Sequence, residues 1–390
     1  MKITSVTGIA LRVPCAPIAD ALSTSTARQA LLVRIDTDAG LFGIGEAFSF
    51  GAPLAAMKAI LEAQLAPSLI GEDPQDIERI WQTLYWRTIA NGRRSLTMAC
   101  ISGVDIALWD LMGKACRMPV CRLLGAYSDR VPSYASGGFY APGKDLDGLR
   151  REIEGYLSRG YRDAKIKIGR TMDRPGAPLS YMANRDWAVT PEEDFRRVAA
   201  AKELLGDGLL IVDTNASWDS YIALSRGREL ARLGVEWLEE PIPFEDLEGY
   251  TRISRELPQL RIIGCETQQG ADNFATMIRS DALDIAQPDA GWVGGISETL
   301  KIGAVAKAAG RKISLHCFGS SVLFAASLQV AAAMSNTERI ESEENPNPLK
   351  TDLVRTPFET DEHMSFLVPQ GEGLGIELDW DKVSDFTVEV

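Results

Sequence analysis

The sequence predicts an α/β protein in which an N-terminal α+β domain precedes a (β/α)₈ barrel of the TIM type. One observation is the pattern of residues 1–125, where a hairpin is followed by helices. A second is the change of rhythm after residue 130, where eight short apolar segments alternate with amphipathic helices. A third is the length of 390 residues, which suits two or three domains.

The first domain is placed at residues 1–128. Residues 29–38 alternate between polar and apolar side chains, and residues 41–47 run back after a short turn, which predicts a β-hairpin. Residues 14–27 are rich in Ser, Thr and Ala and are predicted to form a mobile loop. Apolar residues at helical spacing predict three helices, over 53–66, 75–87 and 95–114.

The barrel is placed at residues 129–360, and residues 361–390 are expected to return to the first domain. A doubly wound sheet is the alternative, but it would want a glycine-rich phosphate loop after an early strand, and none is found. Helices are expected between the barrel strands, for example over 193–205, 220–233, 271–279 and 296–309. The expected strands are 132–136, 163–168, 209–213, 235–239, 261–265, 283–287, 312–316 and 338–341.

The charge and composition of the chain argue against nucleic acid and membranes as binding partners. Acidic residues outnumber basic ones by 54 to 41, which gives a net charge of −13. A chain this acidic lacks the positive field that nucleic acid or an anionic membrane surface would need. No apolar run reaches the ~18 residues of a membrane span, and the N-terminus does not resemble a signal peptide. Six scattered cysteines fit reduced thiols, so a cytoplasmic location is expected.

Three carboxylates end successive predicted strands: Asp213, Glu239 and Glu266. They are 26 and 27 residues apart, about one βα unit each. Strand ends at the C-terminal face of a barrel converge, so the three side chains are expected to meet. Like charges this close need a cation, and oxygen ligands favour Mg²⁺. The alternative is that each acid caps the helix that follows it.

A pair of lysines precedes these acids. Lys165 and Lys167 alternate along one predicted strand and therefore point the same way. Crowding by each other and by a metal is expected to lower the pKa of one of them toward that of a general base. The alternative is an edge strand with solvated lysines.

A histidine and an acid end the next two strands. Asp289 follows strand six and His316 ends strand seven, so an Asp–His acid/base pair is expected. A buried structural histidine is the alternative. Glu341 ends strand eight and, if protonated, would donate a hydrogen bond; the alternative is a plain surface acid. The only other histidine is His363, and so few imidazoles argue against a histidine-rich metallohydrolase.

These groups suit one partial reaction. A metal-bound carboxylate flanked by bases on two sides fits abstraction of the proton α to that carboxylate, with the resulting enolate stabilised by the metal and by cationic neighbours.

At this point the sequence resembles the mandelate racemase group of the enolase superfamily, over essentially the whole chain. The matching motifs are Lys165-Ile-Lys167, Asp213-Thr-Asn215, Trp237-Leu-Glu239-Glu240-Pro241, Gly264-Cys-Glu266, Gln287-Pro-Asp289, His316, Asp105-Ile-Ala-Leu-Trp-Asp110-Leu-Met-Gly-Lys114, Leu123-Leu-Gly125 and the Gly-rich segment 371–378. The resemblance implies that the first domain caps the barrel and that residues 14–27 form a lid. It also implies a homo-oligomer, from dimer to octamer.

The resemblance implies a role for each matching residue. Lys167 and His316 would be the acid/base residues, with Asp289 paired to His316. Lys165 and Glu341 would contact the substrate carboxylate, and Asn215 would lie near the substrate. Mg²⁺ would be bound by Asp213, Glu239 and Glu266.

The overall reaction is open at this stage. Dehydration of a sugar acid to a 2-keto-3-deoxy acid is favoured by analogy with the group; a racemase or epimerase, a lactone cycloisomerase and a non-catalytic binding protein are the alternatives. A long insert at residues 170–192 is predicted to cover the pocket or contact a partner subunit. Tyr140, Phe48 and Trp292 are further specificity candidates.

Overall fold

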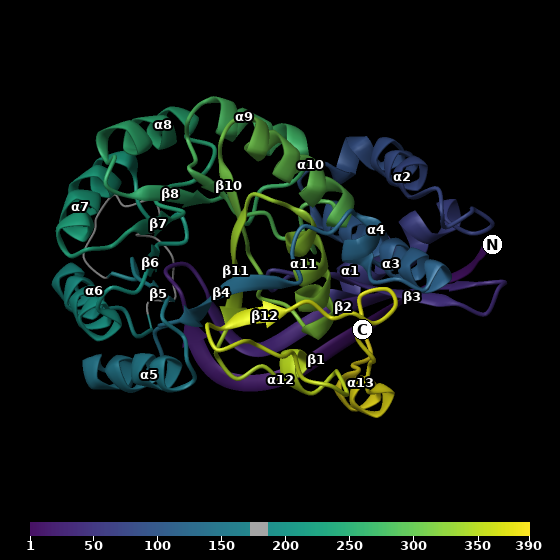
Figure 1. Cartoon of the computed structure of the whole chain (residues 1–390), viewed down its shortest axis with the longest axis horizontal. Helices are drawn as coiled ribbons and strands as arrows, with labels where there is room; N and C mark the ends of the chain where they lie inside the picture. Colours follow the sequence, from purple (N-terminus) through teal and green to yellow (C-terminus); the bar gives the residue numbers. More distant parts are fainter. Residues whose placement is uncertain (172–185) are drawn as a thin grey trace.

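The computed structural model describes residues 1–171 and 186–390, so most of the predicted insert lies outside the described residues. Figure 1 shows the barrel with its ring of helices on the left and the N-terminal domain on the right. The α/β architecture is confirmed.

The N-terminal domain is a three-stranded antiparallel sheet covered by helices. Its strands follow chain order and its longest helix, α3, packs against β3. The close contact requires glycine: a Cβ on Gly45 would lie 2.0 Å from the carbonyl oxygen of Gly103. The elements are β1 (Ile3–Ala19), β2 (Thr24–Thr37), β3 (Phe42–Ala47), α1 (Leu54–Ala59), the π-helix Ile60–Leu65, the 3₁₀ turn Ala66–Ser68, α2 (Ile77–Gly92), α3 (Leu96–Cys116) and α4 (Val120–Leu123).

The first domain corrects the prediction for residues 14–27, which are not a loop. They form the end of the long β1–β2 hairpin, paired through Pro14 with Ala27 and Ile18 with Ser25. Backbone hydrogen bonds of 2.7 and 2.8 Å between Ala19 and Tyr140 attach this end to the barrel domain. The inter-domain pairing therefore orders a segment whose own composition lacks a strand pattern.

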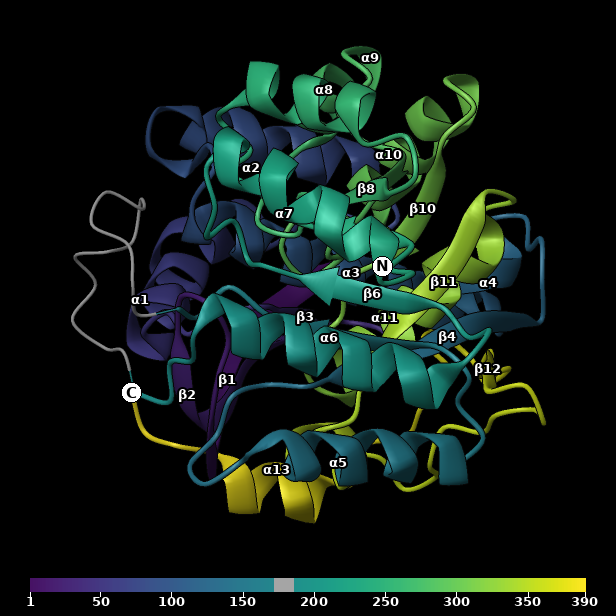
Figure 2. The same ribbon diagram turned by 90° about the vertical axis from the view of Figure 1, so that its left-hand side faces the viewer.

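The barrel consists of eight parallel strands in chain order, closed by pairing of β11 with β4. This closure excludes the doubly wound sheet. Figure 2 shows α5, α6 and α7 lying outside β6. The elements are β4 (Arg130–Gly137), α5 (Leu146–Ser158), β5 (Ala164–Lys167), α6 (Pro191–Leu205), β6 (Leu210–Asp213), α7 (Ser220–Arg232), β7 (Trp237–Glu239), α8 (Leu247–Glu256), β8 (Arg261–Gly264), α9 (Ala271–Arg279), β9 (Ile285–Ala286), α10 (Gly295–Ala308), β10 (Lys312–Leu315), α11 (Ser321–Ala333) and β11 (Thr337–Glu343).

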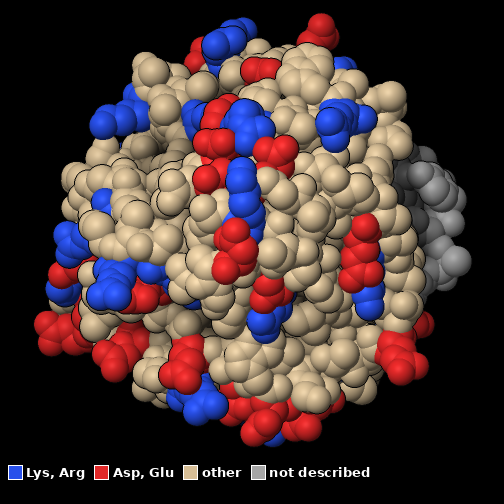
Figure 3. Space-filling view, turned by 90° about the vertical axis from the view of Figure 1, so that its right-hand side faces the viewer, with Lys and Arg blue, Asp and Glu red and all other residues tan. Residues whose placement is uncertain are grey.

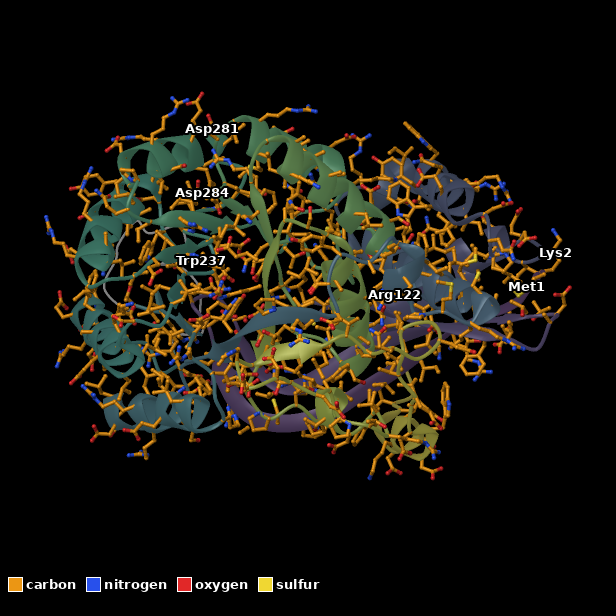
Figure 4. The ribbon with its side chains drawn as sticks, viewed as in Figure 1. Met1, Lys2, Arg122, Trp237, Asp281 and Asp284 are labelled. Carbon is orange, nitrogen blue, oxygen red and sulfur yellow. The ribbon has the colours of Figure 1, made fainter. Side chains whose placement is uncertain are left out.

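One end of the barrel interior is filled by apolar side chains. Trp237 on β7, labelled in Figure 4, is buried with Tyr134, Ile211 and Ile263 in a small separate core. Asp281 and Asp284, labelled nearer the edge in the same view, pair instead with Arg311. The polar groups that concern function therefore gather at the other, C-terminal end of the strands.

The C-terminal segment contacts both domains. It contains α12 (Pro348–Thr351), β12 (Ser365–Leu367) and α13 (Trp380–Phe386), and β12 pairs antiparallel with β4 beside the barrel. The chain then returns to the first domain, where the amide of Leu374 donates to Asp110 (2.8 Å) and that of Val388 to the carbonyl of Ala10 (2.9 Å).

Charged side chains lie on the surface (Figure 3), and the most apolar long helix lies in the interior. Figure 3 shows acidic and basic side chains interspersed on one face, with acidic ones gathered along its lower edge. Helix α3 is long and apolar enough to cross a membrane, but it is largely buried within the protein and serves as a core helix. All six cysteines are free.

Candidate active site

The strand register brings the predicted polar residues to one end of the barrel. Lys167 on β5 pairs with Asp213 on β6, and Asp213 pairs with Glu239 on β7, so the three side chains lie at one level. Glu266 lies two residues beyond the end of β8. Parallel strands of a barrel all present their C-terminal ends at the same face.

Asp213, Glu239 and Glu266 form a buried carboxylate cluster. Each can offer an oxygen atom, and these three atoms lie within 4.8 Å of one another. Burial and the charge of Asp213 raise the pKa of Glu239 well above its usual range. Oε2 of Glu266 is buried and accepts no hydrogen bond from any described residue. Crowded carboxylates with an unsatisfied oxygen fit a hard divalent cation.

Both predicted lysines contact this cluster and are buried, which excludes solvated lysines on an edge strand. Nζ of Lys167 contacts Oδ2 of Asp213. Nζ of Lys165 lies 2.5 Å from Glu239 Oε1 and 2.7 Å from Glu341 Oε1. The expectation of a lowered lysine pKa included the charge of a bound metal, and the residues by themselves shift the pKa of Lys167 the other way. Burial lowers the pKa of Lys167, but attraction by Asp213 outweighs it and the pKa is raised.

His316 lies across the cluster from Lys167. Its Nδ1 is 2.6 Å from Asp289 Oδ2, and its Nε2 is 3.5 Å from Glu266 Oε2. Burial lowers the pKa of His316, but Glu266, Glu341 and Asp289 together raise it to about 10. The acidic surroundings therefore favour the charged imidazole, and Asp289 orients the ring so that Nε2 faces the carboxylates.

Glu341 is not a surface acid, and its surroundings favour the ionised form. It is buried on β11, where its carboxylate accepts from Ser136 Oγ (2.5 Å) and from the amide of Cys317 (3.2 Å). Burial raises its pKa, but Lys165 and His316 lower it by more, so the net pKa falls well below the usual range. An ionised Glu341 accepts hydrogen bonds and fixes Lys165; it does not donate.

A cavity of about 410 Å³ opens onto this group. Lys167, Asn215, Glu266 and His316 line it from the barrel side. Oδ1 of Asn215 is buried and has no hydrogen-bond partner in the described part of the chain. Lys165 is completely buried and lies outside the lining, beside Glu239.

The first domain supplies the opposite wall. The β1–β2 hairpin lines the cavity with residues 23–29, so this segment lies where a lid was expected although it is not a loop. Phe48 also lines the cavity, and its ring centroid is 5.8 Å from that of His316. Tyr140 and Trp292 do not line it; the Tyr140 hydroxyl donates instead to Asp194 (2.6 Å).

Sequence reasoning missed three nearby residues. Gln287 donates to Glu239 Oε2 (2.9 Å), and Glu240 accepts from the amide of Cys265 (3.1 Å). The sequence did offer a signal for these two residues, because each is close to a predicted site residue: Gln287 is two residues before Asp289, and Glu240 follows Glu239. Arg28, from the hairpin, lines the cavity, and nothing in the local sequence indicates this.

Comparison with known proteins agrees with this architecture. Residues 3–125 match the sequence model of the mandelate racemase/muconate lactonizing enzyme N-terminal domain, and residues 148–382 match the enolase C-terminal domain-like model. An arabinonate dehydratase of Saccharolobus solfataricus is 36% identical over 342 residues, 87% of this chain and 86% of its own.

Two further relatives have other activities. A D-galactarolactone cycloisomerase of Agrobacterium fabrum is 33% identical over 370 residues, 92% of this chain and 91% of its own. A racemase from Streptomyces coelicolor, whose crystal structure holds magnesium, has a TM-score of 0.86 at 28% identity, covering 99% of this chain and 100% of that one. The protein is therefore an enzyme of the lyase or isomerase type, and the chain belongs to the mandelate racemase/muconate lactonizing enzyme family of the enolase superfamily.

Proposed function

We propose that this enzyme uses Mg²⁺ to remove the proton α to the carboxylate of a sugar acid, and that it dehydrates this acid to a 2-keto-3-deoxy acid. One observation carries the proposal: Lys167 and His316 face the same carboxylate cluster from different strands and line the same cavity. A substrate carbon held between them has an acid/base group on each side.

The metal is assigned to Asp213, Glu239 and Glu266. Their crowding, and the unsatisfied oxygen of Glu266, suit a small divalent cation with oxygen ligands. Bound Mg²⁺ would supply positive charge that holds the substrate carboxylate and stabilises negative charge developing on it.

The remaining residues hold protons and orient groups. Asp289 keeps His316 oriented with Nε2 toward the cavity, as the 2.6 Å contact indicates. Lys165 adds a positive charge beside the carboxylates, and Glu341 fixes its position through the 2.7 Å ion pair. Asn215 presents an unpartnered amide oxygen that can accept from a substrate hydroxyl.

The dehydration balances in three steps. One of the two bases takes the proton from C2, and the electron pair of that C–H bond moves into the carboxylate to give an enediolate. The C3–O bond then breaks, and the hydroxyl leaves as water with a proton from an acidic group of the site. The resulting enol takes a proton at C3 and becomes the 2-keto acid. Which base acts first depends on the configuration at C2.

Dehydration is chosen over the alternatives because one relative is an arabinonate dehydratase and the site contains both acids and bases. Cycloisomerisation of a sugar-acid lactone is the second candidate, because another relative is a D-galactarolactone cycloisomerase. A racemase would use the same two bases to return the proton to the opposite face. A non-catalytic binding protein would not need two bases beside a metal site.

The test is a panel of aldonic, aldaric and uronic acids and of aldarolactones with Mg²⁺ in D₂O, followed by proton NMR and a semicarbazide assay for 2-keto acids. We expect a 2-keto-3-deoxy acid carrying deuterium at C3. Deuterium at C2 without loss of water would indicate a racemase or epimerase, and loss of a lactone signal a cycloisomerase. Absence of both turnover and exchange across the panel would contradict the proposal.

Matched variants connect any turnover to this site. Lys167→Met and His316→Asn are expected to lower kcat by at least a hundredfold, the usual scale for a positioned acid or base. Lys312→Met and His363→Asn change exposed residues of the same types and should leave kcat unchanged. Equal effects in the two sets would show that the reaction occurs elsewhere.

A further inference from the structure

Two aromatic rings separate the acid/base groups from another polar side chain of the cavity. Nζ of Lys167 lies 5.2 Å from the ring centroid of Phe139, and this ring lies 5.6 Å from that of Phe318. Arg28, on β2, also lines the cavity, and its Cζ lies 4.7 Å from the Phe318 ring centroid. A substrate that starts at Lys167 and is long enough to pass these two rings would reach Arg28.

Arg28 is buried and incompletely paired. Its Nη2 forms an ion pair with Glu343, and its Nε donates to the carbonyl of Pro346 (3.3 Å). Its Nη1 is buried and has no hydrogen-bond partner among residues 1–171 and 186–390. A buried guanidinium donor without an acceptor is unfavourable, and such a group in a native protein needs an explanation. Because Arg28 lines the cavity, we take an oxygen atom of a molecule bound there as the candidate acceptor.

The surrounding charge decides what kind of oxygen fits. Glu343 already occupies one side of the Arg28 guanidinium as an ion-pair partner, and it is itself buried. Arg12 and Asp20 also line the cavity, one residue of each charge. A second carboxylate would be desolvated beside an arginine that already has Glu343 as its ion-pair partner. A hydroxyl needs no such compensation and accepts one hydrogen bond from Nη1.

Resting on the proposed function, we propose that Arg28 binds the hydroxyl group at the end of the substrate opposite its carboxylate. The site then selects monocarboxylic sugar acids, the aldonates, over dicarboxylic aldarates of the same chain length. A site built to hydrogen-bond a substrate hydroxyl discriminates strongly against analogues that lack it. Arg28 is thus a specificity residue contributed by the first domain, remote from the bond that breaks.

The experiment compares pentonates and hexonates with their terminally deoxygenated counterparts and with hexarates. Turnover is measured as kcat/KM, and binding to the Mg²⁺-loaded enzyme is measured by calorimetry. The variants are Arg28→Met, which keeps the apolar stem over Phe318, and Arg28→Met combined with Glu343→Gln, which avoids an unpaired buried acid. Arg12→Met is the control, because Arg12 lines the same cavity but is exposed.

We expect the wild type and Arg12→Met to lose about tenfold or more in kcat/KM when the terminal hydroxyl is removed. Both Arg28 variants should bind the full aldonate more weakly and show no further loss with the deoxy analogue. An equal hydroxyl dependence in all proteins, or a preference for hexarates, would overturn the role of Arg28.

The two proposals fail in different ways. Turnover without dependence on the terminal hydroxyl would refute the Arg28 inference alone. Hydroxyl-dependent binding that is lost in the Arg28 variants, but without turnover, would refute the dehydratase and leave the subsite. Absence of both binding and turnover across the panel would overturn both proposals.

Discussion

Glu46 links the first domain to the barrel through a buried carboxylate whose protonation should control stability. Its side chain on β3 accepts from the amides of Ser320 and Leu323, both 3.1 Å away, and from the Ser320 hydroxyl. These donors form the N-terminus of α11. Burial nevertheless raises the pKa of Glu46 from 4.5 to about 7, and repulsion from Asp289 contributes.

The shift sets the sign and size of the effect. The raised pKa means that the folded protein binds the proton more tightly than the unfolded chain does. The contribution of Glu46 to the free energy of unfolding is therefore highest below pH 4.5, and it decreases as the pH rises to about 7. At 1.36 kcal/mol per pKa unit, the change is about 3 kcal/mol.

The measurement compares wild type with Glu46→Gln, which cannot titrate. Urea unfolding at fixed ionic strength between pH 4.5 and 8 gives the difference between the two proteins at each pH. We expect wild type to lose about 3 kcal/mol relative to the variant over this range. The comparison with Glu46→Gln isolates Glu46, because burial also raises the pKa of Asp105 and of Glu343 to about 7 and both are present in the two proteins. A difference that does not change with pH would refute the reasoning.

Three further predictions concern the metal, the histidine and the packing of the first domain. Mg²⁺ at a hundred times its Kd should raise the unfolding free energy by about 2.7 kcal/mol; Asp213→Asn should lose this in thermal shift assays, and an unchanged response would exclude Asp213 as a ligand. Asp289→Asn should lower the pKa of His316 and slow, by tenfold or more, proton exchange on the face that His316 serves. Exchange on the Lys167 face should persist, and NMR in D₂O separates the two; equal slowing of both faces would contradict separate roles. Gly45→Ala should destabilise the protein by about 1–3 kcal/mol or more, because its Cβ would lie 2.0 Å from a backbone oxygen. Gly155→Ala, whose nearest neighbour would lie at 3.8 Å in helix α5, should instead stabilise slightly, and chemical denaturation of both variants tests the contrast.

The barrel and its carboxylate cluster were predictable because they depend on short-range pattern and on parallel register. Apolar strands ending in Asp213 and Glu239 could be found in the sequence, and parallel pairing then places these ends side by side. The same logic placed Asp289 near His316, and the 2.6 Å contact agrees with it. The bounds of strand β12 and its pairing with β4 could not be placed from the sequence, because three paired residues leave almost no pattern.

The charge states were less predictable than the positions. Whether a buried lysine has a raised or a lowered pKa depends on the difference between desolvation and attraction. For Lys167 the contact with Asp213 decides the sign, and for Glu341 the ion pair with Lys165 does. Spacing along the chain shows which strand ends a side chain occupies, but not which atoms of opposite charge touch it.

The hairpin explains why specificity is harder to predict than chemistry. Arg170, three residues after Lys167, donates to the carbonyl oxygens of Asp20 (2.9 Å) and Ser23 (3.3 Å) at the hairpin tip. The strand that carries one base is therefore tied to the segment that leads to Arg28. The chemical groups come from strand ends of one barrel, whereas the opposite wall of the cavity comes from a distant hairpin held by backbone contacts. Because backbone acceptors have no sequence signature, a wall built on them becomes visible only when the two domains are seen together.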